Sequence, residues 1–531
     1  MPNTFSEIRG SWLFKVALAL ALVALGDWMF WRRGWEGGFV GLFGIAMLAA
    51  LIAAQPALGK RGPATIALGF AALHAVAMVI SPSVLAWLLF WASAAMAALL
   101  SRRARFDDGW RWIQRLVGHA IFSPFAPVGD AMRAHKARRK RTRLRKRAIL
   151  PVLVLPFAGS VAFVCLFAAA NPVIQSWFAS VGWPTLGFES IGRVVFWLMV
   201  FVLAWALLRP RLTRPVFGLF DGRGDFAIPG ISPQSVLLSL MAFNAIFLVQ
   251  NGMDAAWLWG IAPLPDGMTL ADYAHRGAYP LVATALLAAL FVLVAMRPGS
   301  QTAAMPIVRR LVVVWVAQNL VLVANAALRT FDYIDAYSLT VLRIAALLWM
   351  ALVAVGLILI LWRMLADKSA QWLVNANLAA AAILLTAICF VDLGAVAAWW
   401  NVRHAREVDG SGARLDLCYL SRLEDSALLP LIALERQSLP ASLHGRVAAV
   451  RKDVQRRLDA RLADGGWSVA AAARAAEARR LAGGPGPRAY KSDCDGRRIR
   501  LRPAPARSLP SSGDRTGPPA PPSALTGGPE A

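Results

Sequence analysis

The sequence predicts an all-α membrane protein: a bundle of about eleven transmembrane helices, then a small helical C-terminal module and a disordered tail. The first observation is composition: 58% of the 531 residues are hydrophobic and 16% are charged, whereas soluble proteins have roughly 45–50% and about 25%. The second is that apolar runs long enough to cross a hydrocarbon core of about 30 Å recur along the chain. The third is that a helix bonds its backbone groups within one segment, as lipid requires. This composition excludes a soluble enzyme, a disordered chain and a disulfide scaffold.

Eleven apolar runs have about the 20 residues that a transmembrane helix needs. The first is a signal anchor, because it is too long for a cleaved signal peptide and is followed by Trp31, Arg32 and Arg33 instead of small residues. No convincing internal repeat is visible, so we do not expect an inverted-repeat transporter fold. The predicted spans cover residues 12–31, 38–57, 63–80, 83–100, 149–170, 191–208, 231–250, 277–296, 311–328, 339–362 and 373–393.

These spans divide the chain into five regions. They are a four-span N-terminal part (1–100), a basic cytoplasmic loop with an interfacial helix (101–148), a seven-span core (149–400), a small helical module outside the membrane (401–480) and a disordered tail rich in Pro and Gly (481–531).

Two features of the C-terminal regions carry separate expectations. Residues 413–436 have helical propensity, and residues 447–462 place apolar side chains on one helical face, at Val447, Val450, Val454, Leu458 and Leu462. Cys418 and Cys494 would be able to pair in an oxidising compartment. We expect Cys494 to lie in the disordered tail, which argues against that bond.

The distribution of Lys and Arg predicts the orientation of the bundle. With the N-terminus in the cytoplasm, the inner loops hold 27 Lys and Arg residues and the outer loops hold four. Eleven spans then place the C-terminal region outside. That region is itself basic, with 22 Lys and Arg against 14 Asp and Glu, but long segments cross the membrane largely regardless of charge.

The largest inner loop, 101–148, carries 15 basic and 3 acidic residues. Its first half sets Trp110, Ile113, Val117 and Ile121 near helical spacing after an N-cap at Asp107 or Asp108, a pattern typical of a helix in the headgroup plane. Its second half is a polybasic run that we expect to contact anionic lipid rather than nucleic acid or an acidic protein, because basic residues beside a span are what membrane topology already predicts. The predicted lipid-contacting residues are Arg138, Arg139, Lys140, Arg141, Arg143, Arg145, Lys146 and Arg147.

Polar residues gather at the outer ends of spans seven to eleven and predict an outward-facing polar cup. An unpaired Arg at bilayer depth costs at least about 2.5–3.5 kcal/mol, so we expect Arg329 and Arg343 to pair with carboxylates. The expected partners are Asp254, Asp332, Asp335 and Asp392. The alternative is that these residues are interhelical ion pairs and hydrogen bonds that hold the bundle together. The candidates are Asn244, Asn251, Asp254, Tyr273, His275, Arg276, Arg329, Asp332, Asp335, Tyr337, Arg343 and Asp392. The isolated Asp27 and His74 are expected to be bundle contacts.

Catalytic motifs are missing from the sequence. It contains no phosphate-binding loop, no zinc-protease helix, no Cys-x-x-Cys and no nucleophile elbow. Gly222-Arg-Gly-Asp225 matches the Gly-x-Gly-Asp string of intramembrane aspartyl proteases, but it falls in a predicted loop without a partner Asp. We therefore expect neither an enzyme nor a bound cofactor or metal.

Several strings resemble a bacterial family of polytopic membrane proteins that is catalogued as a domain of unknown function, of the 4153 or 4173 type. They are Val249–Asp254, Tyr273–Leu281, Arg329–Arg343, Val391-Asp392 with Asn401-Val402, and Leu415–Leu420 with Leu429-Pro430. The resemblance covers about residues 230–435. It implies a membrane location, in the bacterial inner membrane, and a C-terminal segment beyond the last span, but it supplies no activity, substrate or cofactor.

Three functions are compatible with these features. The first is a non-enzymatic membrane scaffold or sensor whose cup and C-terminal region meet an envelope protein partner. The second is a transporter for a small anionic solute, with Arg329 and Arg343 favouring the anion. The third is a membrane-embedded transferase, for which Asp254, Asp272 and His275 are the only suppliers of a base. We favour the first, because most charged groups lie near the outer ends of the spans instead of in mid-membrane.

Overall fold

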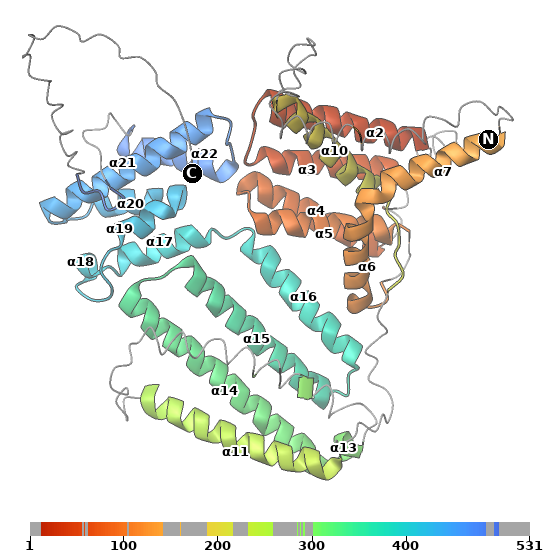
Figure 1. The fold of residues 1–531 in the computed structure, drawn as a ribbon. Helices are drawn as coiled ribbons and strands as arrows, with labels where there is room; N and C mark the ends of the chain where they lie inside the picture. Colours follow the sequence, from red (N-terminus) through yellow and green to blue (C-terminus); the bar gives the residue numbers. More distant parts are fainter. Residues whose placement is uncertain are drawn as a thin grey trace, which may run out of the picture.

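The computed structural model describes residues 12–55, 58, 62–102, 106–141, 160, 188–215, 232–258, 284, 287, 290–291, 301–484 and 493–498. All the secondary-structure elements of these residues are helices, which confirms the predicted all-α class. Figure 1 shows two groups of membrane helices and a third group of C-terminal helices beside them.

The first group packs closely through small side chains. Ala71 and Ala75 on one helix, and Ala94 and Ala97 on the next, are fully buried, and such residues let transmembrane helices approach one another. The group consists of α2 (Trp12–Gly26) with its π-helical continuation η1 (Asp27–Arg32), α3 (Phe39–Ala54), α4 (Gly62–Ile80), α5 (Val84–Leu100) and α10 (Phe188–Leu208).

The second group has a hydrophobic core of its own, which includes Leu240, Val312, Trp315 and Leu357. It consists of α11 (Pro233–Leu258), α13 (Gln301–Ala304), α14 (Pro306–Tyr337), α15 (Val341–Leu365) and α16 (Ala370–Ile388). Helix α16 also contacts α5 of the first group. There the His74 ring lies 3.3 Å from Ser93 Oγ and 3.2 Å from Thr386 Oγ1, so this residue is a contact between the two groups.

In the part of the chain that the structure describes, seven helices are long and apolar enough to cross a membrane, and α3 and α5 are apolar helices of 16 and 17 residues. The chain is therefore a multi-pass membrane protein, as predicted. Predicted span 149–170, apart from residue 160, and most of predicted span 277–296 lie outside the described residues. The largest difference is α14, which was predicted over 311–328 and has 32 residues. At about 1.5 Å per residue it is about 48 Å long and exceeds the hydrocarbon core.

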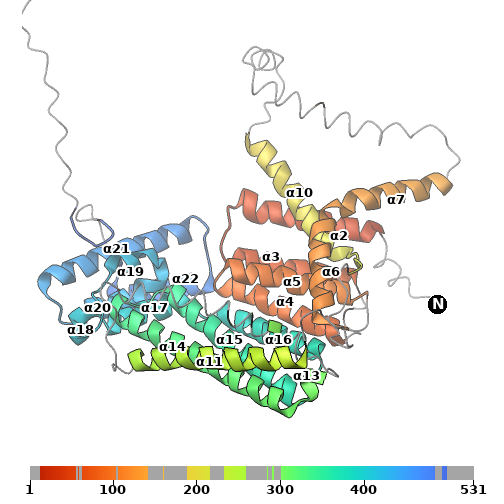
Figure 2. The same ribbon diagram turned by 60° about the horizontal axis from the view of Figure 1, so that its bottom comes forward.

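The basic loop begins with a helix that lies crosswise to the spans. Helix α6 (Gly109–Phe122) is capped by Asp108, one of the two predicted N-caps, and continues through η3 (Ser123–Phe125) into α7 (Ala126–Arg141). Figures 1 and 2 both show α6 across the ends of α4 and α5, whereas α7 points away from the bundle.

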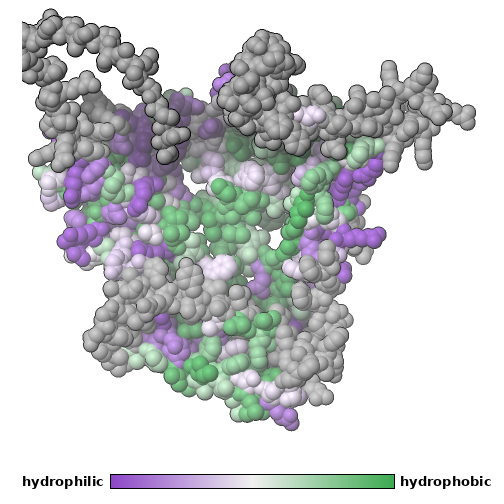
Figure 3. Space-filling model, viewed as in Figure 1, coloured by the Kyte–Doolittle hydropathy of each residue, from purple (hydrophilic) through white to green (hydrophobic). Residues whose placement is uncertain are grey.

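The C-terminal helices enclose a separate hydrophobic core. Val447, Val450, Val454 and Leu458 are buried in it, as the predicted apolar face requires, and Leu462 is partly buried at its edge. In Figure 3, hydrophobic side chains cover the middle of the bundle and hydrophilic ones gather over these helices. The helices are α17 (Leu393–Arg403), α18 (Arg406–Asp409), α19 (Leu417–Arg422), η4 (Glu424–Ala427), α20 (Leu428–Glu435), α21 (Ala441–Ala463) and α22 (Val469–Ala482). We call α17–α22 the module.

The expectation that Cys494 stays unpaired is wrong, because Cys418 and Cys494 form a disulfide across a Cα–Cα distance of 4.7 Å. A short turn brings Cys494 to the module: the Asp493 carboxylate accepts the backbone N–H of Arg497 at 2.7 Å. Asp495 also forms an ion pair with Arg446 of α21. Composition averaged over the whole tail predicts disorder and does not detect so short a turn.

Candidate functional site

The structure separates the predicted cup into three places. In the first, Asp254 of α11 and Arg329 of α14 form a buried ion pair. Asn244 and Asn251 also link these two helices: their side-chain amides donate to the backbone carbonyls of Leu311, at 3.2 Å, and Gln318, at 3.0 Å. These polar groups of α11 are bonded to α14, so they hold two helices together.

The second place is the short turn between α14 and α15. Arg343, in the first turn of α15, donates to the carbonyls of Tyr337, at 2.8 Å, and Ser338, and its guanidinium lies 4.1 Å from the centre of the Tyr333 ring. The expectation that Arg343 pairs with a carboxylate is therefore wrong for the described residues. Only three residues separate the two helices, so the guanidinium lies beside the C-terminal carbonyls of α14, which carry partial negative charge. Asp332 and Asp335 are exposed on α14.

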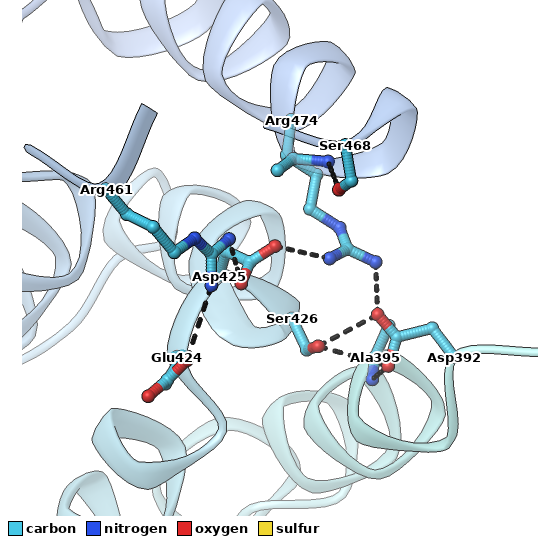
Figure 4. Close-up of polar contacts among 9 residues, drawn as sticks. Asp392, Ala395, Glu424, Asp425, Ser426, Arg461, Ser468 and Arg474 are labelled. Carbon is cyan, nitrogen blue, oxygen red and sulfur yellow. Dashed lines mark hydrogen bonds and ion pairs between the residues drawn. The ribbon is translucent and has the colours of Figure 1, made fainter. Parts of the chain in front are cut away.

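The third place is Asp392, the N-cap of α17, which pairs with neither Arg329 nor Arg343. Its carboxylate accepts the backbone N–H of Ala395 at 2.9 Å and the Ser426 hydroxyl at 2.8 Å, and it forms an ion pair with Arg474 of α22 (Figure 4). The expected cup partner is wrong because α22 supplies a closer cation. Of the remaining candidates, Tyr273, His275 and Arg276 lie outside the described residues.

Arg474 connects Asp392 to a longer chain of charges (Figure 4). Its second nitrogen lies 2.6 Å from Asp425, which is 2.9 Å from Arg461, and Arg461 is 3.5 Å from Glu424. The network thus alternates three carboxylates with two guanidiniums. Arg474 is 17% exposed and Asp425 is 12% exposed, so the central pair is largely withdrawn from water.

The protonation of Asp425 reflects these two cations. Burial opposes ionisation of its carboxyl, but the guanidiniums of Arg461 and Arg474 outweigh burial and place the pKa below its ordinary value of 3.8. At neutral pH Asp425 is therefore an anion that holds α21 and α22 against η4.

Two contacts join the module to the membrane helices. Asn401 of α17 bonds twice to Leu339: its carbonyl accepts the backbone N–H at 2.6 Å and its amide donates to the backbone C=O at 2.8 Å. Tyr419 of α19 accepts the backbone N–H of Val341 at 2.9 Å, and burial raises the pKa of this phenol. These bonds fix α17 and α19 to the turn between α14 and α15, and we call them the turn contact.

The other contact uses the loop between η1 and α3. The backbone N–H groups of Glu36 and Gly38 donate to the carbonyls of Gly465, at 3.0 Å, and Trp467, at 2.5 Å, in the loop before α22. Gly37 has φ +68°, and a Cβ there would lie 2.6 Å from the Trp467 carbonyl oxygen. We call these bonds the loop contact. The turn contact and the loop contact form the module junction, whereas the network around Arg474 lies within the module and holds α22 to η4 and to the start of α17.

Sequence reasoning missed most of this junction and of the network around Arg474, including Asp425, Ser426, Arg461, Gly465, Trp467 and Arg474. It searched for buried polar residues only in the spans, and the Arg474 partner of Asp392 is 82 residues away. It also missed Arg193, whose guanidinium binds Asp27 at 2.6 and 2.7 Å. The available signal was an opposite charge at the corresponding end of another predicted span.

The polar contacts described above join helices to one another. Within the described residues, no group of three or more His, Cys, Asp and Glu side chains is arranged to hold a metal ion. A cavity of about 440 Å³ lies between α11 and α14, and Phe243, Phe247, Phe291 and Trp315 are among its lining residues. No ionisable side chain is among the described lining residues.

A family model for a domain of unknown function, DUF4153, matches residues 64–434. The match starts far before residue 230, where the resemblance was expected to begin, and its end agrees with the expected limit near 435. The turn contact lies within the match, whereas Arg474 and both sides of the loop contact lie outside it. Neither the curated proteins nor the solved structures provide a match. The family model covers more than two thirds of the chain, and the chain therefore belongs to the DUF4153 family.

Proposed function

We propose that this protein is a non-enzymatic membrane scaffold that holds its module in a fixed position at one end of the transmembrane bundle. The observation that supports this most directly is the module junction. The module contacts the bundle through α17, α19 and the loop before α22, and these contacts join residues 36–38 and 339–341 of the bundle to residues 401, 419, 465 and 467 of the module. A module on a flexible linker would need none of these bonds.

We further propose that the junction lies outside the cytoplasm, in the bacterial inner membrane. The short-loop excess of Lys and Arg at the opposite end of the spans favours this orientation. The disulfide between Cys418 and Cys494 also favours it, because such bonds persist in oxidising compartments. The partner of the scaffold would then be an envelope protein that binds the module.

The transporter alternative has less support from the geometry. An anion carrier needs Arg side chains that are accessible to solute, but Arg329 is bonded to Asp254 and Arg343 to backbone carbonyls. A transferase would need a base, and Asp254 is buried against Arg329. Among the described cup residues, Asn244, Asn251, Asp254 and Arg329 therefore serve contacts between α11 and α14.

Photo-crosslinking in cells tests the scaffold. A benzoylphenylalanine residue at exposed Ala460 or Ala473 of the module should form an adduct with one envelope protein. The adduct should disappear when Asn401→Ala and Gly37→Ala together undock the module, while membrane insertion and module folding persist. An adduct that forms to the same extent in the undocked variant would contradict the scaffold function.

A flux assay separates the transporter alternative from the scaffold. Purified protein in proteoliposomes should show no anion flux above that of empty vesicles. Flux that Arg343→Gln abolishes, and that the undocking substitutions leave unchanged, would replace the scaffold with a transporter.

A further inference from the structure

Helix α6 is attached to the bundle by a polar face. Trp112, Arg115 and His119 point along this face and are almost fully buried. Arg115 makes a two-point ion pair with Asp107, at 2.7 and 3.0 Å. In a water-soluble helix the buried face would instead be the apolar one.

The N-terminus of α6 is fixed at the cytoplasmic end proposed above. Asp108 caps the helix and the backbone N–H of Gly109 donates to the Asn375 side chain of α16 at 2.8 Å. The Gln371 side chain donates to the Asp107 carbonyl at 2.8 Å. The position of α6 relative to the spans is thus set by hydrogen bonds to the start of α16.

The apolar residues of α6 and η3 point away from the described part of the protein. Val117, Ile121, Phe122 and Phe125 are 52%, 57%, 58% and 71% exposed. Val117 and Ile121 are one turn apart, on the side of α6 opposite Trp112 and Arg115. Contiguous apolar side chains of this kind mark an interaction site.

We call Val117, Ile121, Phe122 and Phe125 the apolar stripe. Its place in the fold indicates what covers it. Helix α6 lies across the ends of α4 and α5 (Figures 1 and 2), where Gln55 after α3 bonds to Leu207 of α10 at 2.9 Å and to Ser101 after α5. Three spans therefore end at this level, which is where a bilayer has its headgroups.

The charges beside the stripe indicate which class of lipid it contacts. Arg133, Arg209 and Arg211 surround one carboxylate, that of Asp130, at 3.2, 3.6 and 2.7 Å. This cluster keeps an excess of positive charge close to Phe125. The polybasic run predicted to contact lipid, 138–147, follows in the sequence. The side chains of 138–141 and all of 142–147 lie outside the described residues, so that part stays a prediction.

We propose that the apolar stripe of α6 and η3 inserts into the headgroup region of the leaflet at this end, and that the adjacent arginines select anionic lipid. This surface is independent of the scaffold function, because it lies at the end of the bundle opposite the module junction. Helices with one apolar face and basic neighbours bind anionic membrane surfaces in this way.

Spin-label accessibility of the full chain in nanodiscs tests the insertion. Nitroxides at Ile121→Cys and Phe125→Cys should be reached by oxygen, which concentrates in lipid, several-fold better than by a water-soluble nickel chelate. A nitroxide at exposed Ala473→Cys in the module is the matched control and should show the reverse. Free access of the nickel chelate to positions 121 and 125 would overturn the proposal. Access by neither reagent would also overturn it, because the stripe would then be covered by protein.

The lipid composition tests the charge selection. Replacing phosphatidylglycerol with phosphatidylcholine in the nanodiscs should lower the ratio of oxygen to nickel access at 121 and 125. The ratio for the variant Arg133→Gln/Arg211→Gln should depend less on lipid charge than that of the unsubstituted chain. An identical ratio in the two lipids would overturn the selection of anionic lipid.

Discussion

The turn contact and the loop contact attach the same module to the same bundle with different chemistry. The turn contact lies within the DUF4153 match and uses neutral side chains, Asn401 and Tyr419, that bond to backbone groups of residues 339–341. The loop contact joins two segments outside the match through backbone bonds alone. The nearby Arg474 holds α22, which follows this loop, to Asp392 and Asp425 within the module. The family part of the chain thus has its own attachment, and the flanking segments add a second one.

This comparison gives each attachment a separate readout. The amides of Leu339 and Val341 report the turn contact, and the amides of Glu36 and Gly38 report the loop contact. Hydrogen–deuterium exchange measures how often each bond opens. A substitution in one attachment should therefore accelerate exchange there before it affects the other.

The largest effect is expected for Asn401→Ala. It leaves the buried N–H and C=O of Leu339 without partners, and each such group costs about 1–3 kcal/mol. Exchange at residues 339–341 should rise at least tenfold. Asn377→Ala, which removes an amide hydrogen bond within α16 at 2.9 Å, is the matched control and should leave exchange at residues 339–341 unchanged. Unchanged exchange in Asn401→Ala would show that these bonds do not hold the module.

Arg474→Gln should come next, because hydrogen bonds to charged groups contribute about 1.5–3 kcal/mol each in favourable cases. The substitution removes the cation between Asp392 and Asp425, and exchange at residues 36–38 should rise more than at 339–341. Arg480→Gln is the matched control: Arg480 is 71% exposed and pairs within α22, and such pairs contribute little. Equal effects of the two substitutions on exchange at residues 36–38 would show that the network around Arg474 does not support the loop contact.

A smaller effect is expected for Gly37→Ala. A left-handed backbone costs a non-glycine residue roughly 1 kcal/mol or more, and here the added Cβ also meets the Trp467 carbonyl. Gly34→Ala is the control, because Gly34 has φ +63° but no atom within 4 Å of the added Cβ. The difference between the two variants measures the loop contact alone. If they behave identically, residues 37 and 467 do not touch.

The smallest effect is expected when the pH is lowered moderately below neutral. The pKa of Asp425 is lowered in the folded protein, so its contribution is fully present above the unfolded value of about 3.9 and is lost as pH falls through the folded value. Exchange at residues 36–38, corrected for its intrinsic pH dependence, should therefore stay constant from pH 7 to pH 5 and rise only in stronger acid. Asp425→Asn should reduce this acid sensitivity. Loss of protection already near pH 6 would contradict the ion pairs as its source.

The two attachments also show how far the sequence predicts this molecule. Hydropathy predicts the spans because lipid imposes one length and one composition on all of them. It does not predict the extra turns of α14, which lie beyond the apolar run at 311–328. It likewise does not predict that Arg343 faces backbone carbonyls, which depends on the three-residue turn before α15.

The candidate site was harder to predict than the fold. Asp254 was among the partners expected for Arg329, because both residues lie near the same end of predicted spans. The partner of Asp392 was not foreseen, since Arg474 is one of 22 basic residues in residues 401–531. Only the packing of α22 against α20 and α21 brings it to Asp392. The pairing of Cys418 with Cys494 was missed for a different reason, because composition averaged over the tail does not detect the short turn that holds Cys494.

The central claim, that the module is fixed to the bundle, is tested most directly by pulsed electron resonance between two spin labels. Labels at exposed Ala336 on α14 and Ala473 on α22, in a chain without the Cys165 and Cys389 thiols, should give one narrow distance distribution. Asn401→Ala combined with Gly37→Ala, which breaks both attachments, should broaden it. A broad distribution in the unsubstituted chain would contradict the account, because the module would then move freely relative to the membrane helices.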